Sequence, residues 1–233
     1  MIGAVVVLYN PNFNLLQRVL ESIVKQVDFL FLSDNSGCDN WRELGEIGFG
    51  GKEFVYKNNH GNLGIAAAQN CGIEYLASIN CDYVVFFDQD SVAAENLVAN
   101  LYSGFKSIKE SGVKIGGIGA LPINRQRNKA YLPVFEEGKG VFGGIVQVKQ
   151  LISSSSFMDM GVFRDVGNFK ESLFIDAVDH EWCWRAGMSG YRFYRHSGVF
   201  LEHMRGEGDI KVLFVNVAIS TPFRTYYQYR NYL

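Results

Sequence analysis

Short apolar runs alternate with amphipathic segments through the first 110 residues of the chain. Four runs are rich in β-branched and aromatic residues and have the length of buried strands: IGAVVVLY, DFLFLSDNS, EFVYKN and DYVVFFD. Three other segments place apolar residues at helical spacing: NLLQRVLESIVKQ, LGIAAAQNCGIEYLASIN and AAENLVANLYSGFKSIKE. This alternation predicts an α/β fold with an open, mostly parallel sheet flanked by helices.

After Gly112 the pattern becomes less regular. The segment YLPVFEEGKGVFGGIVQVKQLISSSSFMDM indicates hairpins or a smaller region of mixed sheet. No shift in composition marks a linker, so we expect residues 1–111 and 112–220 to form two halves of one domain. Residues 221–233 are expected to start a C-terminal helix that is truncated at Leu233.

Composition argues against several functional classes. The 233 residues have a formal net charge of −2 and scattered basic residues, so no nucleic-acid partner is expected. The four cysteines lack CxxC spacing, which favours reduced thiols over a zinc site. The apolar start lacks a basic leader, and no apolar run approaches the roughly 20 residues that cross a bilayer. We therefore expect a cytoplasmic protein.

The stretch YVVFFDQDSV ends a buried strand in two aspartates, Asp88 and Asp90. Side chains at i and i+2 of an extended segment share one face, and two carboxylates repel unless a positive charge lies between them. A divalent cation with oxygen ligands fits this requirement. The alternative is a turn in which one aspartate caps the following helix.

Polar residues follow two other predicted strands, at Tyr9–Asn10 and at Asp34. The carboxyl ends of parallel strands meet at one edge of the sheet, where ligands bind in open α/β folds. The segment HGNLGIAAAQN adds small residues that let a backbone approach a ligand, or that simply pack a helix on the sheet. It contains neither a GxGxxG motif nor a P-loop lysine.

A third candidate region, FIDAVDHEWCWRAGMSGYRF, mixes acidic and aromatic residues. On a helix, Glu181 and Arg185 form an i,i+4 pair, which is also an ordinary surface arrangement. Trp182 and Trp184 near the acids suit a carbohydrate surface. His196 and His203 flank a further predicted strand, and a lone histidine is more often structural than a metal ligand.

The order of VVVLYNP, SDNS, GNLGIAAAQN, FFDQDS, VDHEWCWR and a later histidine resembles family 2 glycosyltransferases, which have a GT-A fold. The run FIDAVDHEWCWRAGMSGY and the terminal YYQYRN look most like bacterial rhamnosyltransferases that use dTDP-rhamnose. The resemblance covers nearly the whole chain. It implies a metal-dependent, inverting transfer of a sugar, such as rhamnose, from a nucleoside-diphosphate donor to a hydroxyl group during synthesis of a surface polysaccharide such as O-antigen.

The resemblance also assigns roles to individual residues. Asp179 matches the catalytic base. The nucleotide-binding residues it implies are Tyr9, Asn10, Asp34, Asn62, Gly64, Asn70 and Asp88. The implied ligands of Mn²⁺ or Mg²⁺ are Asp88, Asp90 and His203. The implied acceptor-binding residues are Glu181, Trp182 and Arg185. Many relatives have two adjacent acids where this chain has Val178–Asp179, so the base role falls on Asp179, with Asp176 a weak competitor.

The expected partners are a nucleotide-sugar donor and a glycan or lipid-linked glycan acceptor. The tyrosine–arginine tail STPFRTYYQYRNYL either contacts the inner face of the plasma membrane or packs against the domain. Two alternatives stay open. A non-catalytic nucleotide-sugar or glycan-binding module would have a broken acid pair or lack the base. A haloacid dehalogenase-like phosphatase would carry its aspartates after the first strand and not after the fourth.

Overall fold

The computed structural model describes residues 1–47, 49, 51–124, 129–130, 143–203, 209–212, 215–218 and 221–232. For residues 124, 129–130, 203, 209–212 and 215–218 it describes the main chain alone. The elements in chain order are β1 (Ile2–Leu8), α1 (Phe13–Ile23), β2 (Phe29–Asp34), α2 (Trp41–Glu46), β3 (Phe54–Asn58), α3 (Ile65–Ser78), β4 (Tyr83–Asp88), β5 (Val92–Ala93), α4 (Leu97–Glu110), β6 (Ile115–Asn124), β7 (Lys129–Ala130), β8 (Ile145–Val148), β9 (Phe157–Asp159), α5 (Met160–Val166), the 3₁₀ turn η1 (Glu171–Leu173), α6 (Val178–Met188), β10 (Arg192–His203), β11 (Asp209–Val212), β12 (Val215–Ala218) and α7 (Pro222–Tyr232).

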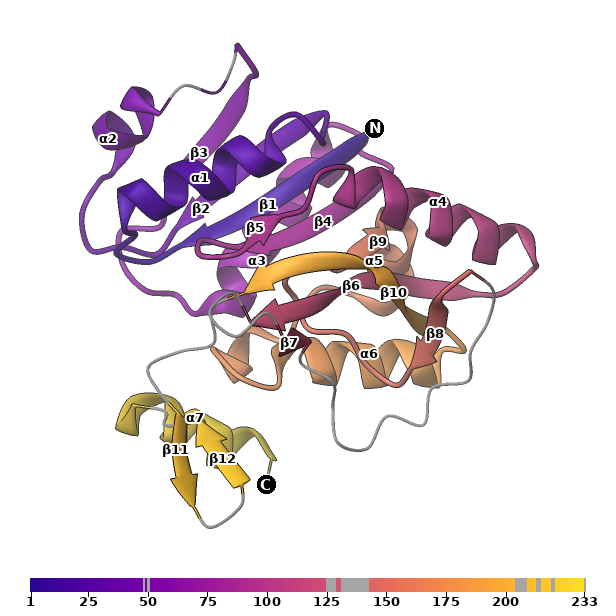
Figure 1. Cartoon of the computed structure of the whole chain (residues 1–233). Coiled ribbons are helices and arrows are strands. Elements are labelled where there is room, and N and C mark those ends of the chain that lie inside the picture. The colour runs from indigo at the N-terminus through magenta and orange to yellow at the C-terminus, as the bar shows by residue number, and fades with distance from the viewer. Residues whose placement is uncertain are drawn as a thin grey trace.

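Ten of the described strands form one sheet, whose main path runs β3-β2-β1-β4-β9-β6-β10-β5 (Figure 1). Strands β1 to β4 pair in parallel. Strand β9 then runs antiparallel to both β4 and β6, and β6 and β10 are parallel to each other. The predicted parallel sheet of the first half and the mixed region after Gly112 are both confirmed.

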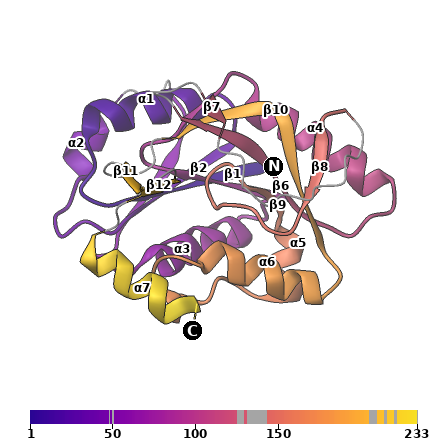
Figure 2. The ribbon, with the colours of Figure 1, turned by 60° about the horizontal axis from the view of Figure 1, so that its bottom comes forward.

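Helices cover both faces of the sheet (Figure 2). Because neighbouring residues of a strand point to opposite faces, Val85 and Phe87 of β4 pack with α1 and α4, whereas Val84 and Phe86 pack with α3 and α6. The strands that carry the candidate site are therefore buried on both sides, which explains their unbroken apolar sequences.

The small residues of α3 allow close packing on β1. A Cβ atom added to Gly72 would lie 2.5 Å from a methyl group of Val5, closer than real side chains approach. Ala66 and Ala68 of the same helix are fully buried. The packing interpretation of this glycine- and alanine-rich segment is therefore correct for the body of the helix.

One predicted boundary differs from the structure. The helix expected from Ala93 begins at Leu97, because Val92 and Ala93 form β5 and pair with the distant strand β10. The C-terminal residues form α7, which lies beside the start of α6 (Figure 2). Among the described residues, no helix is both long and apolar enough to cross a membrane.

Candidate active site

The polar ends of three parallel strands meet at one edge of the sheet. In the register of β1, Leu8 pairs with Asp34 of β2, and Val7 pairs with Asp88 of β4. Tyr9–Asn10 follows β1 at the same edge. The prediction that these strand exits converge is confirmed.

A glutamine between the two aspartates ties the turn after β4 to the end of β1. The amide of Tyr9 donates to Oε1 of Gln89 (2.8 Å), and Nε2 of Gln89 donates to the carbonyl of Tyr9 (3.0 Å). This reciprocal pair fixes the main chain between Asp88 and Asp90. The acid pair is therefore carried by a turn that the protein's own hydrogen bonds anchor.

A run of serines brings the candidate base next to this turn. The amide of Ser153 donates to Oδ2 of Asp179 (3.0 Å), while Oγ of Ser154 accepts from the amide of Asp88 (3.3 Å). Two consecutive residues of one loop thus contact Asp88 and Asp179. Nothing in the sequence analysis singled out SSSS, although four small donors before a strand are a usable signal for a loop that binds polar groups.

Asp179 lies in the first turn of α6, where the helix dipole stabilises a carboxylate. Its Oδ1 accepts from the amide of His180 (2.9 Å), and its side chain is 25% exposed. Each carboxylate oxygen therefore has one main-chain donor and retains a free lone pair. Such a group is held in place and is still open to a substrate hydroxyl.

Helix α7 adds a cation that the sequence analysis did not assign. The guanidinium of Arg224 donates to both carboxylate oxygens of Asp176, with Nη2 2.9 Å from Oδ1. The hydrogen bonds to Asp176 raise the pKa of Arg224, and the charges of Asp88 and Asp179 raise it further. Arg224 consequently lies near carboxylates that come from β4, from the turn before α6 and from α6 itself.

Asp34 is fully buried and already occupied. Its Oδ1 accepts from the amide of Ser36 (2.8 Å), and its Oδ2 accepts from Nδ2 of Asn40 (2.7 Å) and from the hydroxyl of Tyr56 (2.9 Å). Burial, with the nearby Asp34 charge, raises the pKa of Tyr56. Because Asp34 has no exposed surface, its burial argues against the nucleotide-binding role that the resemblance implied. The residue instead fixes the loop that follows β2.

The start of α3 packs against the turn that precedes α6. Oδ1 of Asn62 accepts from the amide of Gly64 (2.9 Å), and the carbonyl of Phe174 accepts from the amide of Ile65 (2.7 Å). Gly64 has a φ of 86°, and a Cβ atom there would lie 2.7 Å from the Phe174 carbonyl oxygen. Glycine is therefore required for protein packing at this point, and the structure gives no nucleotide-facing role to Gly64.

Asn70 is also used within the protein, contrary to its predicted nucleotide-binding role. It is 3% exposed. Its Nδ2 donates to the carbonyl of Phe169 and to Oε1 of Glu171, both at 2.9 Å, and its Oδ1 accepts from the amide of Phe169 (3.0 Å). The amide side chain ties α3 to the segment before η1, and almost none of its surface is exposed to a ligand.

The prediction for Trp182 is wrong. The side chain is fully buried among aromatic rings, and its indole N–H donates to the carbonyl of Gly167 (2.9 Å). No sugar can stack on it. Trp184, on the same helix, is 49% exposed, and its indole N–H is oriented by Oε1 of Gln150 (2.9 Å).

Glu181 and Arg185 form the predicted i,i+4 pair, with Nε 3.0 Å from Oε1. The same guanidinium donates to the carbonyls of Val166 (2.6 Å) and Asn168 (2.9 Å). Arg185 therefore fastens the end of α5 to α6, and Glu181 neutralises it. This arrangement gives both residues a structural role, and with 27% of the Glu181 side chain and 28% of the Arg185 side chain exposed, their acceptor-binding roles stay predictions.

Asp88 and Asp90 are the described residues that fit a divalent cation. Two carboxylates on one turn, completed by water and phosphate oxygens, suit the hard cations Mg²⁺ and Mn²⁺. Among the described side chains, no cluster of three or more His, Cys, Asp and Glu has the arrangement of a metal site. The side chain of His203 lies outside the described part. Its main chain follows the Glu202–Val92 pair of β10 and β5, on the side toward Asp90.

Comparison with solved structures identifies the fold. A structure of GalNAc-T7 with UDP, GalNAc and Mn²⁺ matches 88% of this chain with a TM-score of 0.69 and 13% identity, over 44% of its own length. TarS residues 1–349 from S. aureus, solved with UDP-GlcNAc, matches 88% of this chain with a TM-score of 0.63 and 15% identity, over 59% of its length. The chain thus spans less than two thirds of both structures. The predicted GT-A fold is confirmed.

Comparison of sequences identifies the family. The dTDP-rhamnosyl transferase RfbF of Shigella flexneri is 30% identical over 242 aligned positions, which cover 99% of this chain and 78% of that protein. Residues 4–166 match the family described as Glycosyl transferase family 2. With the acid pair and the candidate base at one edge of its sheet, this chain belongs to glycosyl transferase family 2.

Proposed function

We propose that the protein is an inverting rhamnosyltransferase, which moves rhamnose from dTDP-rhamnose to a hydroxyl group of a surface-glycan acceptor. The donor is inferred from the name of the Shigella flexneri relative, which aligns with almost the whole chain. One observation carries the assignment of the active site. Ser153 and Ser154, adjacent in one loop, contact Asp179 and Asp88 respectively.

Asp179 acts as the general base in this proposal. It accepts the proton of the acceptor hydroxyl as that oxygen attacks the anomeric carbon, and the diphosphate leaves from the opposite face. No covalent intermediate forms, so the anomeric configuration inverts. The main-chain donors of Ser153 and His180 hold the carboxylate and leave lone pairs for this proton.

Asp88 and Asp90 hold the divalent cation in this proposal, and His203 is a third candidate ligand. When bound, Mn²⁺ or Mg²⁺ supplies positive charge that stabilises the leaving diphosphate. The protein's own part is to keep the two carboxylates at the strand exit. The bonds between Gln89 and Tyr9 support this role, because they fix the main chain on both sides of the site.

The nucleotide lies beside β1 and β2 in this proposal. Tyr9 is 50% exposed, and the amide of Asn10 donates to Oγ of Ser36 (2.8 Å), which fixes the turn after β1. Asn62, exposed before α3, is the remaining candidate on that side. Asp34 stabilises the loop after β2, next to this surface, by accepting a hydrogen bond from Asn40.

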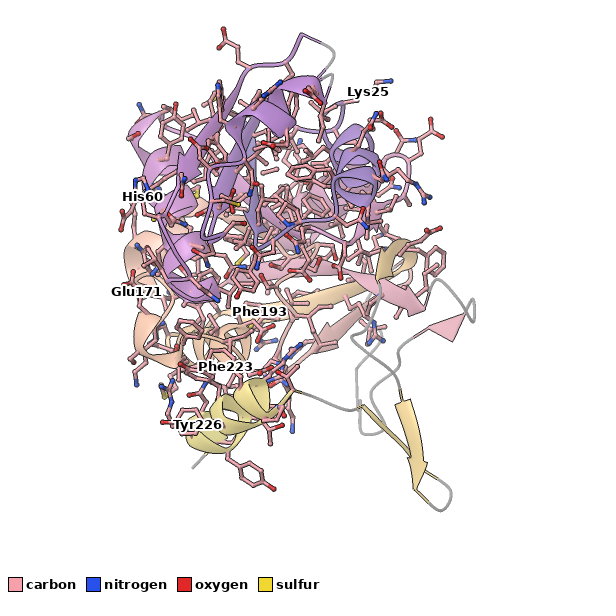
Figure 3. The ribbon with its side chains drawn as sticks, turned by 90° about the vertical axis from the view of Figure 1, so that its left-hand side faces the viewer. Lys25, His60, Glu171, Phe193, Phe223 and Tyr226 are labelled. Atoms are coloured by element: carbon pink, nitrogen blue, oxygen red, sulfur yellow. The ribbon has the colours of Figure 1, made fainter. Side chains whose placement is uncertain are left out.

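In this proposal the acceptor binds beside α6, on the opposite side of the site from the nucleotide. Trp184 replaces Trp182 as the aromatic surface for a sugar, because it is exposed on the helix that carries Asp179. Helix α7 leaves Phe223, Tyr226 and Tyr229 more than half exposed, and Figure 3 shows the first two of them on the helix. Aromatic residues favour the membrane interface, which supports contact with the inner face of the plasma membrane when the acceptor is lipid-linked.

Two measurements test the proposal. Purified protein with Mn²⁺, dTDP-rhamnose and a lipid-linked acceptor should release dTDP, and the product should have the inverted configuration by NMR. Calorimetry should detect Mn²⁺-dependent binding of dTDP that Asp90→Ala loses and Glu95→Ala keeps, since Glu95 is an exposed acid nearby. Retained binding in Asp90→Ala contradicts the cation site. Binding of dTDP without any turnover favours the non-catalytic module.

A further inference from the structure

The segment between η1 and α6 has an unusual main chain. Phe174, Asp176 and Ala177 have φ values of 64°, 61° and 60°, and none of them is glycine. The carbonyl of Leu173 accepts from the amide of Ile175 (2.8 Å), which closes a three-residue turn around Phe174. Turns of this kind with a positive central φ are rare and strained, and such conformations persist only where neighbouring structure holds them.

Helix α7 supplies that support through one amide group. Nδ2 of Asn231 lies 2.9 Å from the carbonyl oxygen of Leu173, and 2.8 Å from those of both Ile175 and Asp176. The two N–H groups of the amide are therefore shared among three acceptors of the strained turn.

Neighbouring residues of α7 hold the same turn. Nη2 of Arg230 donates to the carbonyls of Ser172 (2.6 Å) and Leu173 (2.9 Å). The rings of Tyr227 and Phe174 stack with centroids 4.8 Å apart. No residue of α7 is buried among those described. The helix is therefore attached through polar bonds and ring contacts at its inner side, and it adds little to the apolar core.

The turn that α7 holds leads directly to the candidate base. Ala177 is the N-cap of α6, and its carbonyl accepts from the amide of Glu181 (2.8 Å) in the first helical turn. Asp179 follows two residues later. A second bond from α7, between the hydroxyl of Tyr232 and Nδ1 of His180 (2.9 Å), reaches the residue next to Asp179. The direction in which α6 begins, and hence the position of Asp179, depends on this turn.

We propose that Asn231 is a positioning residue for glycosyl transfer. By binding the carbonyls of Leu173, Ile175 and Asp176, it keeps the strained turn in place and holds Asp179 against the amide of Ser153. Its contribution to catalysis rests on the proposed role of Asp179 as the general base. Asn231 acts through that residue and has no contact with the reacting atoms.

Steady-state kinetics separate positioning from binding. Asn231→Asp keeps the size of the side chain but replaces the donors with acceptors, and it should lower kcat at least tenfold. The KM for dTDP-rhamnose should change less than twofold, because the amide of Asn231 binds the turn before α6, whereas the donor is proposed to bind at the ends of β1, β2 and β4. Asn100→Asp is the matched control, since it makes the same substitution at an exposed position of α4. Wild-type kcat in Asn231→Asp overturns the proposal.

Amide hydrogen exchange gives a readout that does not need turnover. In Asn231→Asp, the amides of Ser153 and His180, which donate to Asp179, should exchange at least tenfold faster than in the wild type. The amides of Val85 and Phe87 in β4 should be unchanged. Equal acceleration at all four amides means general loss of stability, and acceleration at none means no coupling; both results overturn the proposal. If the wild type transfers no sugar, the proposed function fails, and exchange still decides whether Asn231 positions Asp179.

Discussion

Gln89 and Tyr9 exchange two hydrogen bonds, one in each direction, across the ends of β4 and β1. Gln89, the residue between the two aspartates, therefore joins the turn that carries Asp88 and Asp90 to the residue that follows β1.

Gln89→Ala should weaken binding of dTDP with Mn²⁺ by up to about 30-fold. Each of the two lost hydrogen bonds has a net value of about 1 kcal/mol, and about 1.4 kcal/mol corresponds to a factor of ten in affinity. Isothermal titration calorimetry measures the change. Gln17→Ala is the control, because Gln17 is an exposed glutamine that contacts Glu21. An affinity within twofold of the wild type would show that the turn keeps its conformation unaided.

Asp179→Asn should lower kcat by about 10²- to 10⁴-fold, the usual contribution of a general base. Binding of dTDP should be retained, because the loss concerns the proton acceptor alone. The neutral amide also places an NH₂ group against one of the main-chain donors of Ser153 and His180, so a modest fall in melting temperature is expected. Asp165→Asn, at an exposed acid of α5, is the control. Normal turnover in Asp179→Asn would refute the assignment.

The strand ends were predictable because a buried parallel strand has a simple signature. An apolar run that stops in Asp34 or in Asp88 shows both the strand and its polar exit, and parallel pairing then brings the exits together. The same local reasoning fails for Arg224 and Asp176, which are 48 positions apart in the sequence and meet only when α7 folds back onto α6. The strained turn before α6 could not be predicted from the sequence either, because none of its residues with positive φ is glycine.

The error at Trp182 was avoidable. Val178, Trp182 and Ala186 recur at four-residue spacing, and all three are buried. This spacing is the ordinary signal for the inner face of a helix, so a tryptophan in that row was expected in the core. Trp184 falls outside the row and is exposed. For Asn70, by contrast, no pattern in the sequence distinguishes an amide that binds a loop from one that binds a ligand.

Trp184→Ala should raise the KM for the acceptor about tenfold and leave the KM for dTDP-rhamnose unchanged. The indole is an exposed aromatic surface, oriented by Gln150, on the helix of the candidate base. Met188→Ala is the matched control, because Met188 is 85% exposed at the end of the same helix. Initial rates at varied acceptor concentration give both constants. An unchanged acceptor KM would place the sugar-binding surface elsewhere.

The stability of the protein should depend on pH through His196 in β10. Burial lowers the pKa of its ring, and Nδ1 accepts from the amide of Gly198 (3.2 Å), so the native state holds the neutral imidazole. The unfolded chain binds a proton near pH 6.5, above the native pKa. The stabilisation is therefore present above about pH 6.5 and is lost as pH falls through the native pKa, at up to about 1.4 kcal/mol per pH unit. Urea unfolding at several pH values between 7.5 and 5 measures the free energy of unfolding. Plotted against pH, this free energy should have a smaller slope for His196→Asn than for the wild type. His60→Asn, at an exposed histidine, should keep the wild-type slope, and equal slopes in all three proteins would exclude His196 as the cause.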